Sequence, residues 1–236
     1  MMGSISISSA MARRIVRRVA ASARHWFSPD PDRFLKHCST IVHVGANSGQ
    51  ERDLYKRYDL SVFWIEPIPA VYEELVGNLL SYPKQVAIRV LLADKPGQRV
   101  KLNISSNHGA SSSIFDLALH RDIWPEVEYV DALEMQTETL DRLVERGLVR
   151  YPIDALVLDT QGSELLVLKG AEAMLHRIQY VKTEAADFES YKGGATVADI
   201  DRFLTGRSFK LIRSTQFARH PSAGNYYDLV FRRTAE

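Results

Sequence analysis

The sequence of 236 residues has a single cysteine, Cys38, and no long apolar run. One cysteine cannot close an internal disulfide, so the composition does not require an oxidising compartment. No segment approaches the roughly 18 apolar residues that span a bilayer, and the N-terminus lacks the continuous apolar segment of a secretory signal. With 45% hydrophobic and 25% charged residues, the chain has the composition of a folded globule. We expect a cytoplasmic protein.

Net charge is also nearly absent, because 30 Lys and Arg stand against 29 Asp and Glu. Non-specific affinity for nucleic acid requires an excess of cationic side chains, so we expect no nucleic-acid partner. The balance is uneven along the chain, since residues 1–29 hold five arginines and no acid. This asymmetry predicts two parts, an N-terminal helix and linker over residues 1–36 and one domain over residues 37–236.

The arginine-rich segment is amphipathic when it is drawn as a helix. All five arginines fall on one side, and the other side carries apolar residues that include Trp26 and Phe27. The common interpretation is a helix that packs its apolar face on the domain. A peripheral membrane contact through residues 11–27 and an arginine-rich transit peptide are the open alternatives. The run Ser28–Asp32 contains two prolines and ends the helix.

Short β-rich runs alternate with helical runs from residue 40 onwards, which predicts an α/β fold with a mostly parallel sheet. We expect strands over residues 40–44, 62–65, 86–92, 153–158 and 178–183. We expect helices over residues 48–58, 70–80, 139–146, 163–176 and 197–205. Strand-like stretches over 99–104 and 127–135 enclose a loop-rich insert. The last two strands, 209–213 and 226–231, have no helix between them, which predicts a C-terminal antiparallel strand.

A glycine-containing turn follows the first predicted strand, and an acid ends the second. In a parallel sheet, ligands bind at the carboxyl ends of the strands. The turn contains Gly45 and Gly49, and Glu66 follows Gly45 by 21 residues, a spacing at which an acid accepts hydrogen bonds from ribose hydroxyls. The glycines alone also fit a plain tight turn. With Glu66 they predict a site for an adenosine-containing cofactor.

The spacing of the glycines distinguishes among such cofactors. The dinucleotide pattern GxGxxG would need glycine where the chain has Asn47 and Gln50, and there is no GxxxxGK[ST] run for a P-loop. A cofactor without a pyrophosphate has less need of these glycines. The sequence therefore favours S-adenosylmethionine over NAD, and it disfavours an oxidoreductase.

Five motifs in order resemble the FkbM-type S-adenosylmethionine-dependent methyltransferases over roughly residues 40–212. They are His43-Val44-Gly45-Ala46-Asn47-Ser48-Gly49, Trp64-Ile65-Glu66-Pro67-Ile68-Pro69, Ser112-Ser113-Ile114, Leu158-Asp159-Thr160-Gln161-Gly162-Ser163-Glu164 with Leu168-Lys169-Gly170-Ala171, and a strand-end Glu184. The resemblance implies a class I methyltransferase fold, a Rossmann-like three-layer sandwich. It also implies methyl transfer to a hydroxyl oxygen of a small molecule such as a sugar or a polyketide.

The resemblance assigns cofactor contacts to residues in these motifs. Glu66 would bind the ribose hydroxyls with Pro67 beside it, and Asp94 would lie near the adenine. The methionine part would lie along Gly45, Ala46, Asn47 and Gly49, with Asp159 facing the sulfonium or the acceptor. This chain departs from the family at two positions. His43 replaces the acid that opens the first motif, and Val157 replaces the lysine two positions before Asp159.

Three residues are candidates for catalysis. Asp159 is the first choice for taking the hydroxyl proton, since it follows an apolar strand; a helix cap is its structural alternative. Glu184 ends another strand, where an ordinary ion pair is equally plausible. His108 lies in the insert and has a suitable pKa range, although most such histidines are merely polar loop residues. Glu164 is expected to be an acid at a helix N-terminus.

The expected reaction is O-methylation of a sugar or glycolipid, with the 2-hydroxyl of a fucosyl residue on a nodulation-type lipo-oligosaccharide as the narrower suggestion. A polyketide or other small-molecule acceptor and a non-catalytic nucleoside-binding module are the alternatives. No cluster of acids, histidines or cysteines specifies a metal site, so we expect none. The sequence does not determine the oligomeric state.

Overall fold

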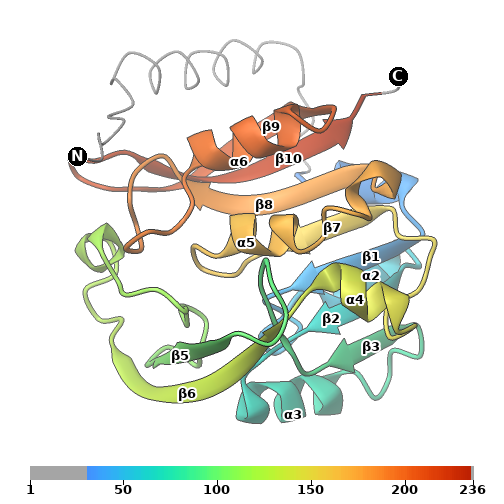
Figure 1. Ribbon diagram of the computed structural model, residues 1–236, viewed down its shortest axis with the longest axis horizontal. Helices are drawn as coiled ribbons and strands as arrows, with labels where there is room; N and C mark the ends of the chain where they lie inside the picture. The colour runs from blue at the N-terminus through green and yellow to red at the C-terminus, as the bar shows by residue number, and fades with distance from the viewer. Residues whose placement is uncertain (1–30, 235–236) are drawn as a thin grey trace.

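The computed structural model describes residues 31–234, so the predicted N-terminal helix and its membrane-contact segment, residues 11–27, lie outside the described residues. The main element is a seven-stranded sheet with the strand order β3-β2-β1-β7-β8-β10-β9 (Figure 1). In that order the strands are Gln85–Ile88, Ser61–Ile65, Thr40–Val44, Ala155–Leu158, Tyr180–Ala186, Asn225–Arg233 and Phe209–Arg219.

The central strands are parallel, and one strand near the edge is not. β1 pairs in parallel with both β2 and β7, and β7 pairs in parallel with β8. Every residue of β1 and of β7 is buried, as expected for strands covered on both faces. β10 runs antiparallel to β8 and to β9, which confirms the predicted C-terminal antiparallel strand.

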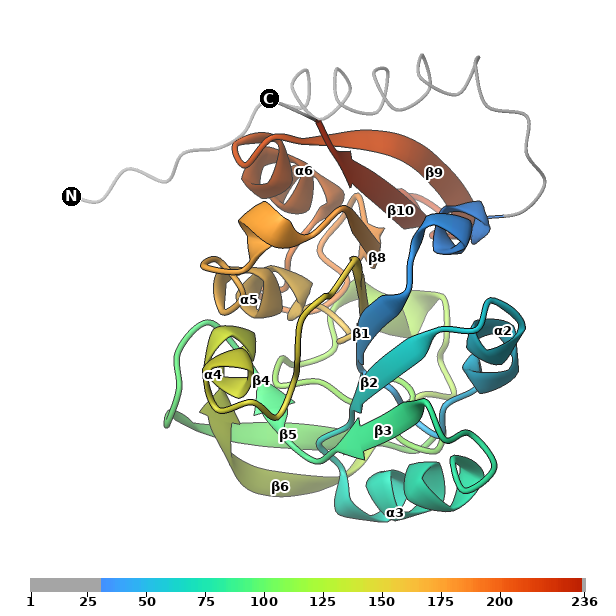
Figure 2. The ribbon, with the colours of Figure 1, turned by 90° about the vertical axis from the view of Figure 1, so that its right-hand side faces the viewer.

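Helices cover both faces of this sheet (Figure 2). The 3-10 helix η1 (Arg33–His37) and the helices α2 (Arg52–Arg57) and α3 (Pro69–Asn78) pack on one face. The helices α4 (Leu140–Glu145), α5 (Glu164–Lys169) and α6 (Val197–Thr205) pack on the other. Two separate apolar clusters fill the spaces between the layers. The predicted α/β fold, a Rossmann-like three-layer sandwich with a mostly parallel sheet, is confirmed.

A second, three-stranded sheet has the order β4-β6-β5, with strands Leu91–Leu92, Tyr129–Glu138 and Arg99–Ser105. The prediction of one strand over residues 86–92 is therefore wrong. Its first half is β3 in the main sheet, whereas Leu91 and Leu92 pair with the end of β6. The insert between β5 and β6 also contains a 3-10 helix, η2 (Leu119–Asp122).

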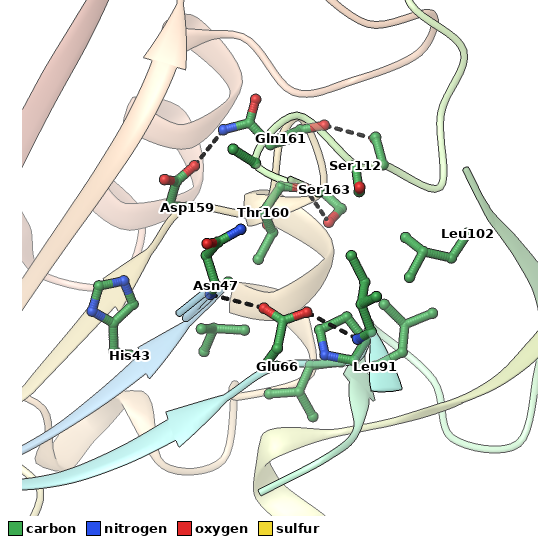
Figure 3. A pocket seen from close by; sticks show the side chains of 18 of the residues that line it. His43, Asn47, Glu66, Leu91, Leu102, Ser112, Asp159, Thr160, Gln161 and Ser163 are labelled. Carbon is green, nitrogen blue, oxygen red and sulfur yellow. Dashed lines mark hydrogen bonds between the residues drawn. The ribbon is translucent and has the colours of Figure 1, made fainter. Parts of the chain in front are cut away.

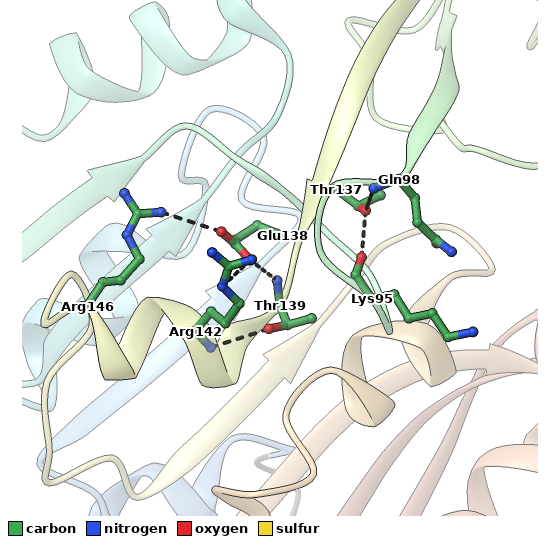
Figure 4. Close-up of polar contacts among 7 residues, drawn as sticks. All are labelled: Lys95, Gln98, Thr137, Glu138, Thr139, Arg142 and Arg146. Carbon is green, nitrogen blue, oxygen red and sulfur yellow. Dashed lines mark hydrogen bonds and ion pairs between the residues drawn. The ribbon is translucent and has the colours of Figure 1, made fainter.

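Hydrogen bonds at the end of β6 join this strand to the turn after β4 and to the start of α4 (Figure 4). The side chain of Thr137 donates to the carbonyl of Lys95 and accepts from the backbone N–H of Gln98, so it holds the turn between β4 and β5. The Thr139 hydroxyl accepts from the backbone N–H of Arg142 and caps α4. The turn that follows β4 is thus fixed to the end of β6.

Two predicted helices are shorter than expected. The helix predicted over 48–58 begins at Arg52, because Asn47 and Gly49 adopt positive φ angles of 43° and 74° that a helix does not allow. The helix predicted over 163–176 ends at Lys169, and a separate 3-10 turn, η3 (Leu175–Arg177), follows. Between them, Asp141 accepts hydrogen bonds from the backbone N–H groups of Ala173 and Met174, and the Met174 N–H also donates to the carbonyl of Ala171 in a turn.

Candidate functional site

The carboxyl ends of β1, β2 and β7 meet at a cavity of about 230 Å³ (Figure 3). The cavity is lined by the turn after β1, the segment after β2, the start of β4, the insert and the loop after β7. This is the edge of a parallel sheet at which ligands bind. Of the predicted cofactor-binding residues, those that line the cavity are Gly45, Asn47, Glu66, Pro67 and Asp159.

Gly45 allows the ends of β1 and β7 to touch. Its φ is +82°, and a Cβ at this position would lie 1.7 Å from the carbonyl oxygen of Asp159. Only glycine satisfies both conditions. The turn after β1 can therefore pass directly under the cavity, with its backbone close to whatever binds there.

Glu66 is a buried carboxylate with two backbone partners. Its side chain is 4% exposed; Oε2 accepts from the N–H of Asn47 at 2.8 Å, and Oε1 accepts from the N–H of Ile68 at 2.9 Å. Burial raises the pKa of Glu66 to about 7, although these two hydrogen bonds oppose the shift. Each oxygen retains a further lone pair that can accept from a hydroxyl group. Glu66 thus fits the expected contact with a ribose.

An apolar surface lies beside Glu66, where a purine can pack. The residues that form it are Ile68, Val90, Leu91, Leu92 and Leu102. Asp94, which was expected near the adenine, does not line this cavity. It follows β4 in the turn toward β5, because the chain leaves the main sheet after β3 and presents the leucines of β4 in its place. The sequence did not reveal this change of sheet.

Ala46 and Gly49 were also expected to contact the cofactor, and neither lines the cavity. Ala46 is 1% exposed and belongs to the apolar core on the α2 and α3 face. At Gly49 a Cβ would lie 2.7 Å from a side-chain carbon of Leu75 in α3. The close approach at this glycine is therefore made by α3, and its role in the structure is packing.

Asp159 lies at the end of β7 and faces the cavity (Figure 3). Its Oδ1 accepts a hydrogen bond from Nε2 of Gln161. Burial, and then the nearby charge of Glu164, raise the pKa of Asp159 above its usual range, while the Gln161 donor lowers it. Within residues 31–234 no group donates a hydrogen bond to Oδ2. Asp159 can therefore take a proton near neutral pH.

Gln161 is held on three sides, and sequence reasoning did not assign it a function. Besides Asp159, its Oε1 accepts from the Tyr191 hydroxyl at 2.6 Å, and its backbone carbonyl accepts from Oγ of Ser113 at 2.7 Å. The residue adopts a positive φ of 54°. Its place in the fourth motif was the available signal, whereas Tyr191 lies outside every motif. Gln161 joins the loop after β7 to the insert and to the loop after β8.

Glu164 organises the same loop from the start of α5. The side chain is 2% exposed, and its two oxygens accept hydrogen bonds from the N–H groups of Thr160 and Gly162. These contacts fit the expectation of an acid at a helix N-terminus. Glu164 acts on the loop backbone and holds Gln161 in place.

A polar contact joins the insert to the turn after β1. Nδ2 of Asn47 donates to the carbonyl oxygen of His108 at 3.1 Å. The His108 side chain is exposed and does not line the cavity, so this residue reaches the site through its backbone.

Glu184 was expected to end its strand, but it lies within β8, which continues to Ala186. It lines a second, small cavity of about 20 Å³, which we call the Glu184 cavity. Burial and the charge of Asp159 raise its pKa well above its usual range. Leu158 and Thr183 are partners in register, so Asp159 and Glu184 each follow a paired position on neighbouring strands. The negative charge of Asp159 therefore hinders loss of the proton from Glu184.

The two departures from the family lie side by side in the sheet, because Val157 is the register partner of His43 on one side and of Lys182 on the other. His43 is 4% exposed and stacks on Trp64, with ring centroids 4.8 Å apart. Burial lowers the pKa of His43 to about 3, so it is neutral. An acid and a lysine are thus replaced together by two uncharged residues. Lys182 pairs instead with Asp32, at 2.8 Å.

Two kinds of feature are absent from residues 31–234. This part of the chain contains no group of three or more histidines, cysteines and acids that could hold a metal ion. Its helices include none that is long and apolar enough to cross a membrane.

A family model described as the methyltransferase FkbM domain matches residues 43–211, which is well over half of the sequence. The chain belongs to the FkbM family of methyltransferases. It is accordingly an S-adenosylmethionine-dependent enzyme, and the oxidoreductase alternative is set aside. None of the curated proteins matches this FkbM-family chain closely.

Solved structures with a similar fold include three methyltransferases of low sequence identity. Magnesium protoporphyrin IX methyltransferase from Synechocystis, with bound SAM, is 12% identical and has a TM-score of 0.46; the match covers 99% of this chain and 87% of that one. An O-methyltransferase from Bacillus cereus in complex with SAH is 12% identical with a TM-score of 0.46, over 97% and 93%. A putative RNA methyltransferase from Pyrococcus horikoshii is 8% identical with a TM-score of 0.45, over 94% and 98%.

Proposed function

We propose that this FkbM-family enzyme methylates a hydroxyl oxygen of a sugar or glycolipid. The observation that carries the proposal is the position of Asp159, a partly buried carboxyl with a raised pKa that faces the main cavity directly after β7. Transfer to oxygen at neutral pH benefits from a group that removes the hydroxyl proton, and a base is most effective when its pKa is close to the working pH.

The main cavity fits the cofactor. Glu66 offers two acceptor oxygens for a ribose, and the turn at Gly45 leaves room for a ligand to lie against the backbone. Three acids line the cavity, Glu51, Glu66 and Asp159, and no Lys or Arg of residues 31–234 does. An acidic wall suits a cationic ligand. S-adenosylmethionine supplies an electrophilic methyl group on a positively charged sulfur and leaves as a neutral sulfide.

The protein's own contribution is orientation and a proton acceptor. Gln161 fixes the Asp159 carboxylate through Oδ1, which leaves Oδ2 free to accept the hydroxyl proton. The proton lost by the acceptor for each methyl group gained is then held on Asp159 until solvent takes it. Proximity and orientation supply much of the remaining rate enhancement.

The test is transfer of labelled methyl groups to a panel of glycans, glycolipids and polyketides that includes a terminal fucosyl residue. We expect Asp159→Asn to lower kcat by about 10²-fold or more, while the affinity for S-adenosylhomocysteine changes little. Asp116→Asn, on an exposed acid, is the matched control. Transfer to a polyketide alone would support the other acceptor class. Near-normal kcat in Asp159→Asn would remove the proposed base.

A further inference from the structure

The main cavity and the Glu184 cavity share one lining residue, Gln161. This residue is fixed, because it is bonded to Asp159 on one side and to the buried Tyr191 hydroxyl on the other. Tyr191 also lines the Glu184 cavity. The two cavities are therefore neighbouring compartments of one site, with Gln161 between them.

The Glu184 cavity has the size of a single small polar group. Its volume of about 20 Å³ holds one water molecule or one hydroxyl group and no larger ligand. Ser190 and Tyr226 add polar side chains to the wall, and three alanines make up much of the rest. Within residues 31–234 no group donates a hydrogen bond to the Glu184 carboxyl, which is free to bind an incoming hydroxyl.

The charges around Glu184 select against anions. Asp159, Asp228 and Glu164 face it with negative charge, and the one cation that acts on it, Lys182, is paired with Asp32. No Lys or Arg of residues 31–234 lines either cavity. A phosphate or carboxylate placed here would lose its hydration without gaining a counter-ion, which is costly.

Register places Asp159 and Glu184 on adjacent strands, one residue beyond the paired Leu158 and Thr183. Neighbouring strands lie about 4.8 Å apart, and a carboxylate accepts a hydrogen bond from a hydroxyl at about 2.7 Å, so carboxylates on two adjacent strands can converge on two hydroxyl groups of one ring. A ligand that lies across Gln161 can thus present one hydroxyl to Asp159 and the next to Glu184.

We propose that the Glu184 cavity seats the hydroxyl group next to the one that is methylated, so that the acceptor is an uncharged ring with two neighbouring hydroxyl groups. The inference rests on the proposed function and narrows its substrate class. The anchoring hydroxyl keeps its proton and hydrogen-bonds to Glu184. The reacting hydroxyl loses its proton to Asp159 as its oxygen forms the new bond to carbon.

The experiment pairs changes in the acceptor with changes in the protein. The probes are the methyl glycosides of fucose and glucose, their monodeoxy analogues, and glucose 6-phosphate. Transfer of labelled methyl groups gives kcat/KM. Saturation-transfer NMR on the complex with S-adenosylhomocysteine gives binding without turnover. The variants are Glu184→Ala and the isosteric Glu184→Gln, with Glu189→Ala on the following exposed loop as control. Thermal unfolding verifies that each variant is folded.

For the wild type we expect removal of the neighbouring hydroxyl to lower kcat/KM by about 10-fold or more, and the saturation-transfer signal should fall with it. In Glu184→Ala, removal of the same hydroxyl from the acceptor should lower kcat/KM almost no further, since both changes remove the same contact. Glu189→Ala should retain the full penalty, and glucose 6-phosphate should be the poorest probe.

A full deoxy penalty in folded Glu184→Ala would overturn the inference, whereas Glu184→Gln should retain part of the penalty because its amide can still hydrogen-bond a hydroxyl. Preference for glucose 6-phosphate over the methyl glucoside would also overturn the inference, as would binding of S-adenosylhomocysteine with no saturation transfer to any neutral glycoside. If the wild type does not bind S-adenosylhomocysteine at all, the proposed function fails and the inference fails with it. The binding measurement therefore separates the two failures.

Discussion

The two halves of the proposed site, one for the cofactor and one for the acceptor, are built by different means. The cofactor half uses backbone geometry and near neighbours, since Glu66 is held by the N–H groups of Asn47 and Ile68. The acceptor half uses side chains from distant segments, such as Gln161 with Tyr191. A site made from backbone is fixed by the fold, whereas one made from distant side chains can be changed residue by residue. We expect substitutions in the first half to affect folding and cofactor binding, and those in the second to affect acceptor choice and pH dependence.

The largest effect is expected from Gly45→Ala. The new Cβ would lie 1.7 Å from the Asp159 carbonyl oxygen, on a residue with φ of +82°, so β1 and β7 must separate. We expect a loss of about 4 kcal/mol or more in the free energy of unfolding, measured by urea denaturation. Gly97→Ala is the matched control, because φ is +74° there and no atom lies within 4 Å. That variant should lose only about 1–2 kcal/mol. Equal losses would contradict the steric argument.

Next is Glu66→Gln, which tests the cofactor half without changing its shape. The amide cannot accept from both N–H groups and from a ribose, so S-adenosylhomocysteine should bind about 10–100-fold more weakly by calorimetry. Glu73→Gln, on the exposed face of α3, should bind normally. In the wild type, affinity should rise with pH through about 7, because the ionised Glu66 is the better acceptor. Affinity independent of pH would argue against this role.

A smaller effect is expected from Tyr191→Phe in the acceptor half. Burial raises the pKa of Tyr191, which therefore stays protonated and donates to Gln161. Without that donor the Gln161 amide can turn away from Asp159, whose carboxylate loses a hydrogen bond, and the pKa of Asp159 should rise. The acidic limb of the pH profile of kcat/KM should move to higher pH. At neutral pH, kcat/KM should fall by at most about 10-fold.

The control for this variant is Tyr129→Phe, which removes a hydroxyl that donates to the Phe115 carbonyl at 2.7 Å. Its pH profile should match the wild type. An unchanged profile in Tyr191→Phe would show that Gln161 does not depend on Tyr191.

The smallest effect is on stability and concerns Glu184→Gln. The pKa of Glu184 is higher in the folded state than in the unfolded state. The contribution of Glu184 to stability is therefore fully present below the unfolded-state pKa, and it is lost as the pH rises through the folded-state pKa. The glutamine variant escapes this loss. The Tm of this variant should equal that of the wild type at about pH 5 and exceed it by about 2–4 °C at about pH 9. A difference independent of pH would contradict the shift.

Much of the fold was predictable, because hydrophobic patterning is local. Residues 40–44 form β1 as predicted, and the missing helix between the last two strands identified the antiparallel β10. The prediction of a single strand over residues 86–92 was wrong for a physical reason. Patterning reports that a segment is extended and buried, and it does not report which sheet supplies the partner. Leu91 and Leu92 pair with β6, which comes more than thirty residues later in the sequence.

The same distinction separates the two halves of the site. Gly45, Asn47, Glu66 and Asp159 follow predicted strands and were found from their positions. Leu91 and Leu92, and not Asp94, lie beside Glu66 because the chain changes sheets after β3, and this change could not be predicted from the sequence. The role of Gln161 depended on Tyr191, thirty residues away, and on Ser113 in the insert. Contacts between side chains of distant segments leave no periodic or spacing signal.

The insert is tied to both halves at once, through the contact of Asn47 with His108 and that of Ser113 with Gln161. A change in its length or path disturbs the turn under the cofactor as well as the wall of the acceptor compartment. Efforts to broaden the acceptor range by exchanging this loop will therefore also alter cofactor affinity. Point changes around Glu184 leave both ties intact and are the safer route to a new specificity.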